Sequence, residues 1–274
     1  MMGYISEFAQ SKVTTATLRK MKEKGEKIAC LTSYDFTMAS IVDAAGVDFI
    51  LVGDSAANVM MGYDTTVPIT LDDMITYAKG VVRAAKRAIV IVDMPFGYYQ
   101  GQPQVAVESA VKIMKLTGAA GVKMEGGREI SEEIRRVIAA GIPVCGHLGL
   151  TPQSVNVFGG YGVRAKGDAE AEKLMANALE LERLGCFAIV LEKIPAALAA
   201  RVAQSVSVPV IGIGAGSQVD GQVLVVQDML GMNRGFSPKF MRRYGDMGNE
   251  MQQALEHYVS DVKEVDFPNA QEQY

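Results

Sequence analysis

The chain has 274 residues, of which 27 are basic and 31 acidic, and its formal net charge at neutral pH is −4. The 49% of apolar residues can supply the core of one large domain. No basic block points to nucleic acid as a partner, no apolar run reaches the roughly 18 residues of a membrane span, and the N-terminus lacks an export pattern. We therefore expect a cytoplasmic protein.

Short runs rich in Val, Ile and Leu alternate along the chain with longer amphipathic segments. The runs are continuously apolar, as expected when both faces of a parallel sheet are covered. They predict eight strands, over residues 28–32, 48–53, 88–93, 121–125, 143–147, 187–192, 209–213 and 222–227. Eight such units without a break in composition predict an α/β fold, a single (β/α)8 TIM barrel that spans residues 1–274.

Capping residues predict where several of the intervening helices begin or end. Thr70 is the expected N-cap of one helix, and others begin close to Pro103 and Ser131. Residues 168–184 are rich in Ala, Glu and Leu, and Gly185 follows them as a C-terminal stop.

Two further helices are expected outside the barrel pattern. Residues 14–24 predict an extra N-terminal helix that could close the N-terminal end of the barrel, and residues 245–262 predict a C-terminal helix. The polar residues from about 263 to 274 are expected to form a mobile tail. The interval between the seventh and eighth strands is too short for more than a small helix.

Four acidic residues stand at the ends of separate apolar runs, namely Asp54, Asp93, Glu125 and Glu192. A carboxylate is costly to desolvate, so it rarely ends a buried strand without a purpose. The ends of parallel strands meet at the C-terminal face of a barrel, which is where barrel enzymes carry their active sites. The first three acids come from neighbouring strands and are the oxygen ligands that Mg2+ prefers. The alternative is that each acid caps a helix or pairs with a nearby base.

Three more features favour acid-base chemistry at the same end. Strand alternation places Lys123 on the same face as Glu125, where its ammonium could neutralise the acids or hold a substrate carboxylate. A Schiff-base role is less favoured, because nearby acids keep the amine protonated. His147 follows the fifth strand between glycines and is a candidate for contact with substrate or metal, or else a buried core histidine. Glu192 lies apart from the three acids and suits a general base, with an ion pair to a neighbouring lysine as the alternative.

The remaining patterns are less specific. The polar segment 151–167 follows the fifth strand and is typical of a lid or a binding loop. The glycines between Gly212 and Gly216 could hold an anion or form a tight turn. The three cysteines lie in or beside apolar runs and are expected to be reduced core residues. His257, in the C-terminal helix, is expected to face solvent.

Several motifs stand in an order that resembles the ketopantoate hydroxymethyltransferase family, from about Thr14 to Tyr258. They include Gly53-Asp54-Ser55, Asp93-Met94-Pro95-Phe96, Val122-Lys123-Met124-Glu125-Gly126-Gly127, Gly146-His147-Leu148-Gly149-Leu150-Thr151-Pro152-Gln153-Ser154 and Leu191-Glu192. The resemblance implies transfer of a hydroxymethyl group from 5,10-methylenetetrahydrofolate to 3-methyl-2-oxobutanoate, which gives 2-dehydropantoate for pantothenate biosynthesis. It implies a Mg2+-stabilised enolate as the reacting species.

The resemblance also assigns roles to individual residues. It implies that Mg2+, or a similar divalent cation, lies among Asp54, Asp93 and Glu125, and that Glu192 is the catalytic base. The residues that it places in contact with the keto acid are Ser55, Asp93, Lys123 and His147. It further implies a homo-oligomer, typically a decamer, with small-molecule substrates and neither nucleic acid nor membrane as a partner.

A few positions depart from the family pattern. Ala56-Ala57, Gly62-Tyr63 and Lys193 replace residues that are frequent in the family. They bear on loop shape and on folate contacts, and they leave the proposed ligands and base unchanged.

Two other readings compete with the transferase. One is a Mg2+-dependent lyase or mutase of the phosphoenolpyruvate/pyruvate barrel type, which would not need the folate donor. The other is a barrel that only binds a metabolite and assembles, which would not catalyse proton exchange at C3 of the keto acid.

Overall fold

The computed structural model describes residues 11–233, 235 and 237–274. The chain divides into two compact units, Met1–Leu224 and Val225–Tyr274. The first unit holds the barrel, and the second holds helices α10 (Val226–Met229) and α11 (Met247–Lys263). The expectation of a single domain with a mobile tail stays a prediction.

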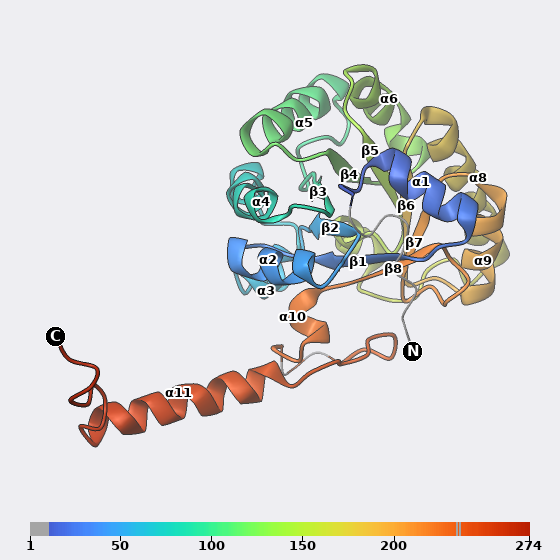
Figure 1. Cartoon of the computed structure of the whole chain (residues 1–274). Helices are drawn as coiled ribbons and strands as arrows, with labels where there is room; N and C mark the ends of the chain where they lie inside the picture. The colour runs from blue at the N-terminus through green and yellow to red at the C-terminus, as the bar shows by residue number, and fades with distance from the viewer. Residues whose placement is uncertain (1–10, 234, 236) are drawn as a thin grey trace. The chain divides into compact units, whose positions relative to one another are not determined.

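Eight parallel strands close into a barrel in sequence order, with β8 pairing back to β1 (Figure 1). The strands are β1 (Ile28–Thr32), β2 (Phe49–Val52), β3 (Ile89–Asp93), β4 (Gly121–Glu125), β5 (Val144–Gly149), β6 (Ala188–Glu192), β7 (Val210–Ile213) and β8 (Gly221–Leu224). Each strand pairs with its neighbour in a parallel register. The predicted (β/α)8 barrel is confirmed.

Helices surround the barrel on its outer side (Figure 1). The longer ones are α2 (Phe36–Ala44), α4 (Leu71–Ala84), α5 (Pro103–Thr117), α6 (Ser131–Ala139), α8 (Asp168–Leu184) and α9 (Ala196–Ser205). Four short helical turns lie in connections that follow strands β2, β4 and β5. They are α3 (Ala56–Val59), η1 (Arg128–Ile130), η2 (Pro152–Ser154) and α7 (Val155–Phe158).

The predicted helix caps are confirmed in their chemistry. The Thr70 hydroxyl accepts the backbone N–H of Asp73, and the Asp73 carboxylate accepts the N–H of Thr70, which forms a capping box at the start of α4. Helix α8 ends at Gly185, whose φ of 97° is in the left-handed region and whose N–H bonds back to Glu182 and Leu181.

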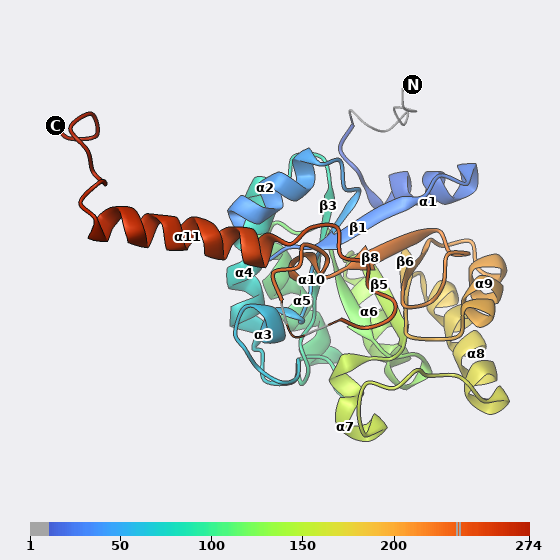
Figure 2. The same cartoon turned by 90° about the horizontal axis from the view of Figure 1, so that it is seen from below.

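Helix α1 (Thr15–Lys24) fills the N-terminal end of the barrel, as the sequence predicted. Its buried side chains Leu18 and Met21 join the same core cluster as the first residues of several strands, including Ile28 and Ile89. Lys22 donates from Nζ to the carbonyl oxygens of Ala203 and Val208 at 2.9 and 2.8 Å. In Figure 2, α1 lies at one end of the barrel, and α3 and α7 lie at the opposite end.

The predicted eighth strand was wrong at its C-terminal end. Strand β8 stops at Leu224, and residues from Val226 form the short helix α10 instead. A short apolar run is equally compatible with a strand and with a buried helical turn, so periodicity could not separate the two. Between β7 and β8 the described chain contains no helix, in line with the short interval.

Two smaller expectations concern the cysteines and membrane-spanning helices. Cys30, Cys145 and Cys186 are buried and free, as predicted. None of the helices in the described part of the chain has the length and apolar character needed to cross a membrane.

Replacing Leu18 tests the role of α1 as the closure of the barrel. The side chain is fully buried in the core, so Leu18→Ala should lower the free energy of unfolding by about 2–5 kcal/mol. Arg19→Ala, on the exposed face of the same helix, should change it by less than about 0.5 kcal/mol. Urea unfolding of the two variants measures both effects, and equal midpoints would contradict the packing role.

Candidate active site

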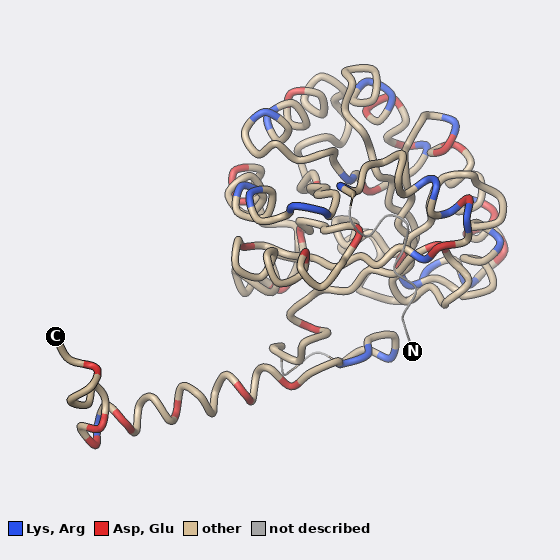
Figure 3. Tube along the Cα trace, in the orientation of Figure 1, with Lys and Arg blue, Asp and Glu red and all other residues tan. Residues whose placement is uncertain are grey.

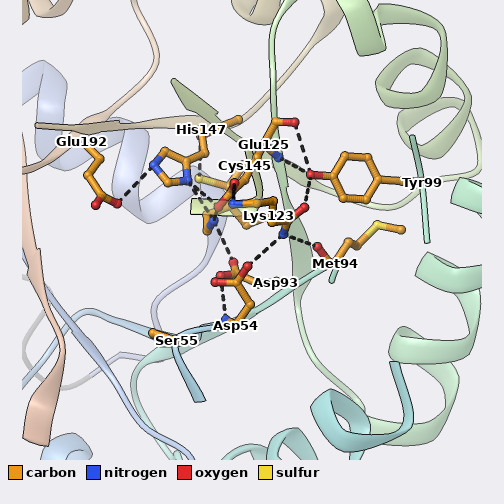
Figure 4. Close-up of polar contacts among 12 residues, drawn as sticks. Asp54, Ser55, Asp93, Met94, Tyr99, Lys123, Glu125, Cys145, His147 and Glu192 are labelled. Carbon is orange, nitrogen blue, oxygen red and sulfur yellow. Dashed lines mark hydrogen bonds and ion pairs between the residues drawn. The ribbon is translucent and has the colours of Figure 1, made fainter. Parts of the chain in front are cut away.

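The predicted site residues converge at the C-terminal ends of β2 to β6 (Figure 4). The strand register sets Asp93 beside Lys123 and Glu125 beside His147. Five of these side chains are at most 6% exposed: Asp54, Asp93, Lys123, Glu125 and His147. The Glu192 side chain, at the end of β6, is 17% exposed. The barrel therefore brings the four strand-end acids, the lysine and the histidine into one space.

Lys123 is the cation at the centre of this cluster. Its Nζ lies 3.2 Å from Asp93 Oδ1, 3.5 Å from Glu125 Oε1 and 3.1 Å from His147 Nδ1. Burial opposes the charge, but the carboxylates of Asp93, Glu125 and Asp54 outweigh it and raise the pKa of Lys123 above its usual value. The amine therefore stays protonated, which makes it a poor nucleophile for a Schiff base.

The three buried carboxylates carry more negative charge than one lysine can balance. Burial, reinforced by the charge of Glu125, raises the pKa of Asp54 to about 6, although Lys123 and Gln153 oppose the rise. Burial also raises the pKa of Asp93 to about 7 against the attraction of Lys123. Burial likewise raises the pKa of Glu125. A site with this excess of negative charge would be stabilised by a further cation.

His147 links the lysine cluster to Glu192. An ammonium only donates, so the contact with Lys123 makes His147 Nδ1 an acceptor and places the ring proton on Nε2. Nε2 faces Glu192 Oε2 at 3.5 Å, and Nδ1 also lies 3.2 Å from Glu125 Oε1. Burial and the charge of Lys123 lower the pKa of His147 to about 4. A neutral imidazole therefore presents its N–H to the carboxylate of Glu192.

Asp54 and Asp93 are the acids that fit a divalent cation. Asp93 Oδ2 accepts the backbone N–H of Asp54 at 3.0 Å, while Oδ1 is buried, without a hydrogen bond, and paired only electrostatically with Lys123. Mg2+ takes one or two protein carboxylates and completes its shell with water and substrate oxygens. These two carboxylates match that requirement in number and chemistry, and their ligation of a cation stays a prediction.

The third predicted ligand is held differently. Glu125 Oε1 faces Lys123 and His147, and Oε2 accepts the backbone N–H of Gln153 at 3.0 Å. Across residues 11–233, 235 and 237–274, no group of three or more His, Cys, Asp or Glu side chains is placed to hold a metal ion. Ligation by Glu125 stays a prediction.

Ser55 lies at the turn that follows β2, next to Asp54 (Figure 4). Its Oγ is 2.8 Å from the hydroxyl of Tyr34, which is fully buried. The tyrosine holds the serine hydroxyl at the edge of the acid cluster, where it could contact a substrate carboxylate. Tyr34 was missed by the sequence analysis, because an isolated tyrosine after β1 carries no pattern.

Gln153 and Tyr99 were also missed as site residues. Gln153 bonds to the carboxylate of Asp54, and the Tyr99 hydroxyl accepts the backbone N–H of Glu125 at 3.0 Å. The sequence signal for Gln153 was its position in the specific segment after the fifth strand. No signal pointed to Tyr99.

A cavity of about 660 Å³ adjoins the acid cluster on the side of Tyr99 and Gln153. Glu125 also lines it, together with apolar and aromatic side chains that include Phe96 and Phe158. The guanidinium of Arg164, another lining residue, lies 3.9 Å from the centre of the Phe158 ring. This volume is within the range of small-molecule sites.

The glycines after β7 form a turn. Gly214 and Gly216 have φ of 61° and 80°, and a Cβ on Gly216 would come within 2.4 Å of the Ala196 side chain. Conformation and close packing account for these glycines. Anion binding there stays a prediction.

Comparison with known proteins agrees with this arrangement. The sequence profile of the family described as ketopantoate hydroxymethyltransferase matches residues 12–270. The chain belongs to this family. It is 63% identical over 274 residues to a Bacteroides fragilis protein named 3-methyl-2-oxobutanoate hydroxymethyltransferase, with full coverage of both chains. A protein of that name from Flavobacterium johnsoniae is 62% identical over 263 residues, covering 96% of this chain and 97% of the relative.

Solved structures share the fold of this ketopantoate hydroxymethyltransferase family member at low identity. Phosphonopyruvate hydrolase in complex with oxalate and Mg++ has a TM-score of 0.60 at 12% identity, with 95% of this chain and 93% of that chain covered. A 2,3-dimethylmalate lyase, titled a member of the PEP mutase/isocitrate lyase superfamily, has a TM-score of 0.58 at 18% identity, with 94% and 90% covered. These likenesses show the barrel fold alone.

Removing the central ammonium should make stability depend strongly on pH. At pH 8, Lys123→Met leaves buried carboxylates without their cation, so the metal-free protein should lose about 3–5 kcal/mol of unfolding free energy. The pKa of Asp93 in the folded protein is about 7, against 3.8 ordinarily. Between about pH 4 and pH 7, Asp93 ionises more readily in the unfolded protein than in the folded one, so the free energy of unfolding falls as pH rises. At pH 5 the Asp93 carboxyl is mostly protonated in the folded protein. Lys123→Met should then lower the free energy of unfolding by less than it does at pH 8.

Urea unfolding at the two pH values measures this effect. Lys112→Met is the matched control, because Lys112 forms an exposed ion pair with Asp72 whose loss should cost less than about 1 kcal/mol at either pH. A loss in Lys123→Met that does not grow between pH 5 and pH 8 would contradict the buried ion cluster.

Proposed function

We propose that the chain transfers a hydroxymethyl group from 5,10-methylenetetrahydrofolate to 3-methyl-2-oxobutanoate and gives 2-dehydropantoate, a step of pantothenate biosynthesis. The observation that carries the proposal is the arrangement of five side chains in one cluster, with Glu192 partly exposed and Asp54, Asp93, Lys123 and His147 buried. The cluster offers three things to one small keto acid: a pair of carboxylates that can bind a cation, a fixed positive charge, and a carboxylate base.

The carboxylates of Asp54 and Asp93 would hold Mg2+ or a similar divalent cation. Bound there, the ion would withdraw charge from the keto oxygen and offset the excess negative charge of the acids. The protonated Lys123 adds a second fixed positive charge where negative charge develops on the keto acid. The Ser55 hydroxyl, oriented by Tyr34, donates to the substrate carboxylate.

Glu192 removes the proton from C3 of the keto acid. Its carboxylate is partly exposed at the end of β6, and the N–H of His147 faces it, which orients the oxygen that takes the proton. The electron pair of the broken C3–H bond then forms the new C–C bond to the one-carbon unit, which the folate donor delivers at the oxidation level of formaldehyde. One water is consumed: its oxygen becomes the new hydroxyl as the two C–N bonds to the carrier break and tetrahydrofolate leaves. Glu192 returns its proton to that oxygen. His147 stays neutral and also borders the keto acid.

The segment after β5 supplies the cover that this chemistry needs. Leu150 donates its N–H to the carbonyl of Glu192, and Arg164 donates its N–H to the carbonyl of Lys193, both at 2.8 Å. The segment between these anchors includes α7 and the exposed Val157. It acts as a lid that keeps bulk water from the enolate and the one-carbon unit, apart from the single water that the transfer consumes.

A lyase or mutase of the phosphoenolpyruvate/pyruvate type is the second candidate. Solved barrels of that type resemble this chain at low identity, which supports a shared fold and leaves the activity open. Such an enzyme would turn over without methylenetetrahydrofolate.

The proposed setting is the cytoplasm, where reduced thiols persist, and the three buried free cysteines support it. Acidic and basic residues are interspersed over the barrel helices (Figure 3). No basic block recommends nucleic acid as a partner, and no membrane partner is proposed.

The chain is proposed to work as a homo-oligomer, a decamer by resemblance to the family. Helix α11 supports self-association, because apolar side chains recur on one of its faces at helical spacing. They are Met251, Leu255, Tyr258, Val259 and Val262, each at least 43% exposed. A second copy of the chain would bury this stripe.

Replacing the base should stop proton removal without stopping binding. Glu192→Gln should lower deuterium exchange at C3 of 3-methyl-2-oxobutanoate by about 10²–10⁴-fold, because the amide cannot accept the proton. NMR in D2O with Mg2+ and no folate measures the exchange. Glu172→Gln, at an exposed position of α8, should exchange at the wild-type rate.

Three outcomes would count against the assignment. Wild-type exchange in Glu192→Gln would remove Glu192 as the base, and full exchange in the presence of a chelator would remove the cation. Formation of product from the keto acid without methylenetetrahydrofolate would favour the lyase or mutase.

Adding charge to the α11 stripe should weaken assembly. Leu255→Glu places a carboxylate in the middle of the apolar face, so the species seen by analytical ultracentrifugation should become smaller. Gln253→Glu adds the same charge on the opposite face of the helix and should leave the mass unchanged. Equal masses for both variants would show that this stripe is not the oligomer contact.

A further inference from the structure

Gln153 lies in the segment that follows β5, in the 3-10 helix η2. Its side chain extends toward Asp54, which follows β2, and its backbone N–H faces Glu125 at the end of β4. The residue is 5% exposed. We propose that Gln153 is a positioning residue that fixes the carboxylates of Asp54 and Glu125 relative to each other. The inference rests on the proposed function, because it assigns a role within that same site.

The nitrogen end of the Gln153 amide is bonded to two acceptors. Nε2 donates to Asp54 Oδ2 at 2.9 Å and to the carbonyl oxygen of Met94 at 2.9 Å. Neither acceptor can donate when Asp54 is ionised, so the amide has one orientation only. The bond to Asp54 fixes the rotamer of that carboxylate, and the bond to Met94 holds the Gln153 amide against the residue that follows β3.

The oxygen end is satisfied by two donors. Oε1 accepts from the Tyr99 hydroxyl at 2.7 Å and from Gln100 Nε2 at 3.0 Å. The Tyr99 hydroxyl in turn accepts the backbone N–H of Glu125 at 3.0 Å. The side chain of Gln153 is therefore held at both ends by groups that follow two strands, β2 and β3.

The backbone of Gln153 holds the other acid. Its N–H donates to Glu125 Oε2 at 3.0 Å. This N–H is at the start of η2 and has no partner within the short helix, so it is available to a carboxylate. One residue thus binds Asp54 through its side chain and Glu125 through its main chain.

The chemistry of an amide suits this position. A neutral amide supplies two donors and an acceptor without adding charge to a cluster that already holds three carboxylates. A glutamate of the same size would set an acceptor against Asp54 Oδ2 and the Met94 carbonyl. A methionine would fill the volume and make none of the four side-chain bonds.

Two substitutions separate positioning from packing. Gln153→Glu keeps the volume and the acceptor for Tyr99, and Gln153→Met keeps the volume alone. The same exchanges at Gln204, an exposed residue of α9, are the controls. The measurements are the Kd of Mn2+ alone by calorimetry, kcat and KM for both substrates, and the urea midpoint.

We expect the Kd of Mn2+ to rise by about 10–100-fold in both Gln153 variants, as is typical when a residue that orients a metal ligand is lost. The value of kcat should fall by a similar factor, while KM for methylenetetrahydrofolate stays within about twofold. The Gln204 variants should match the wild type. Wild-type Mn2+ affinity and kcat in Gln153→Glu would overturn the inference.

Failure of the proposed function would give a different result. If the wild type bound no Mn2+, the cation site would be wrong, and crystal structures of metal-free wild type and Gln153→Glu would then decide the role of Gln153. A displaced Asp54 carboxylate in the variant would support positioning. An unchanged carboxylate would overturn it.

Discussion

The buried ammonium of Lys123 is the interaction on which the site depends. Three carboxylates at the ends of neighbouring strands would repel one another in a space that is nearly closed to water, and Lys123 is the group that partly balances them. The balance is incomplete, since the pKa values of Asp54 and Asp93 remain raised. This remaining negative charge is what makes a cation-dependent reaction physically reasonable here.

The same cluster divides its acids by environment. Asp93 keeps a buried oxygen without a hydrogen bond, whereas the two oxygens of Glu125 face the ammonium of Lys123 and the backbone N–H of Gln153. Glu192 stands farther out and contacts the N–H of His147. Carboxylates of similar intrinsic acidity can therefore serve as ligand, support and base, because the barrel gives each different neighbours.

Much of this organisation was predictable from the sequence. Continuous Val, Ile and Leu runs marked the strands, and an acid directly after such a run marked the C-terminal face of the barrel. Tyr99 carried no sequence signal, and the segment that holds Gln153 did not reveal its contacts, because each residue lies on a loop that brings a polar group across from another strand. The predicted C-terminal end of β8 was wrong for another reason: a short apolar run has no periodicity that distinguishes a strand from a helical turn.

Helix α1 packs into the N-terminal end of the barrel, and its side chains join the core there. Both reactants of the proposed transfer would then enter, and its product would leave, through the opposite face. A keto acid that sits deep against Lys123 would be trapped beneath a larger folate above it. Such a one-sided route favours compulsory order, in which the small reactant arrives first and the hydroxymethylated acid departs after the spent carrier.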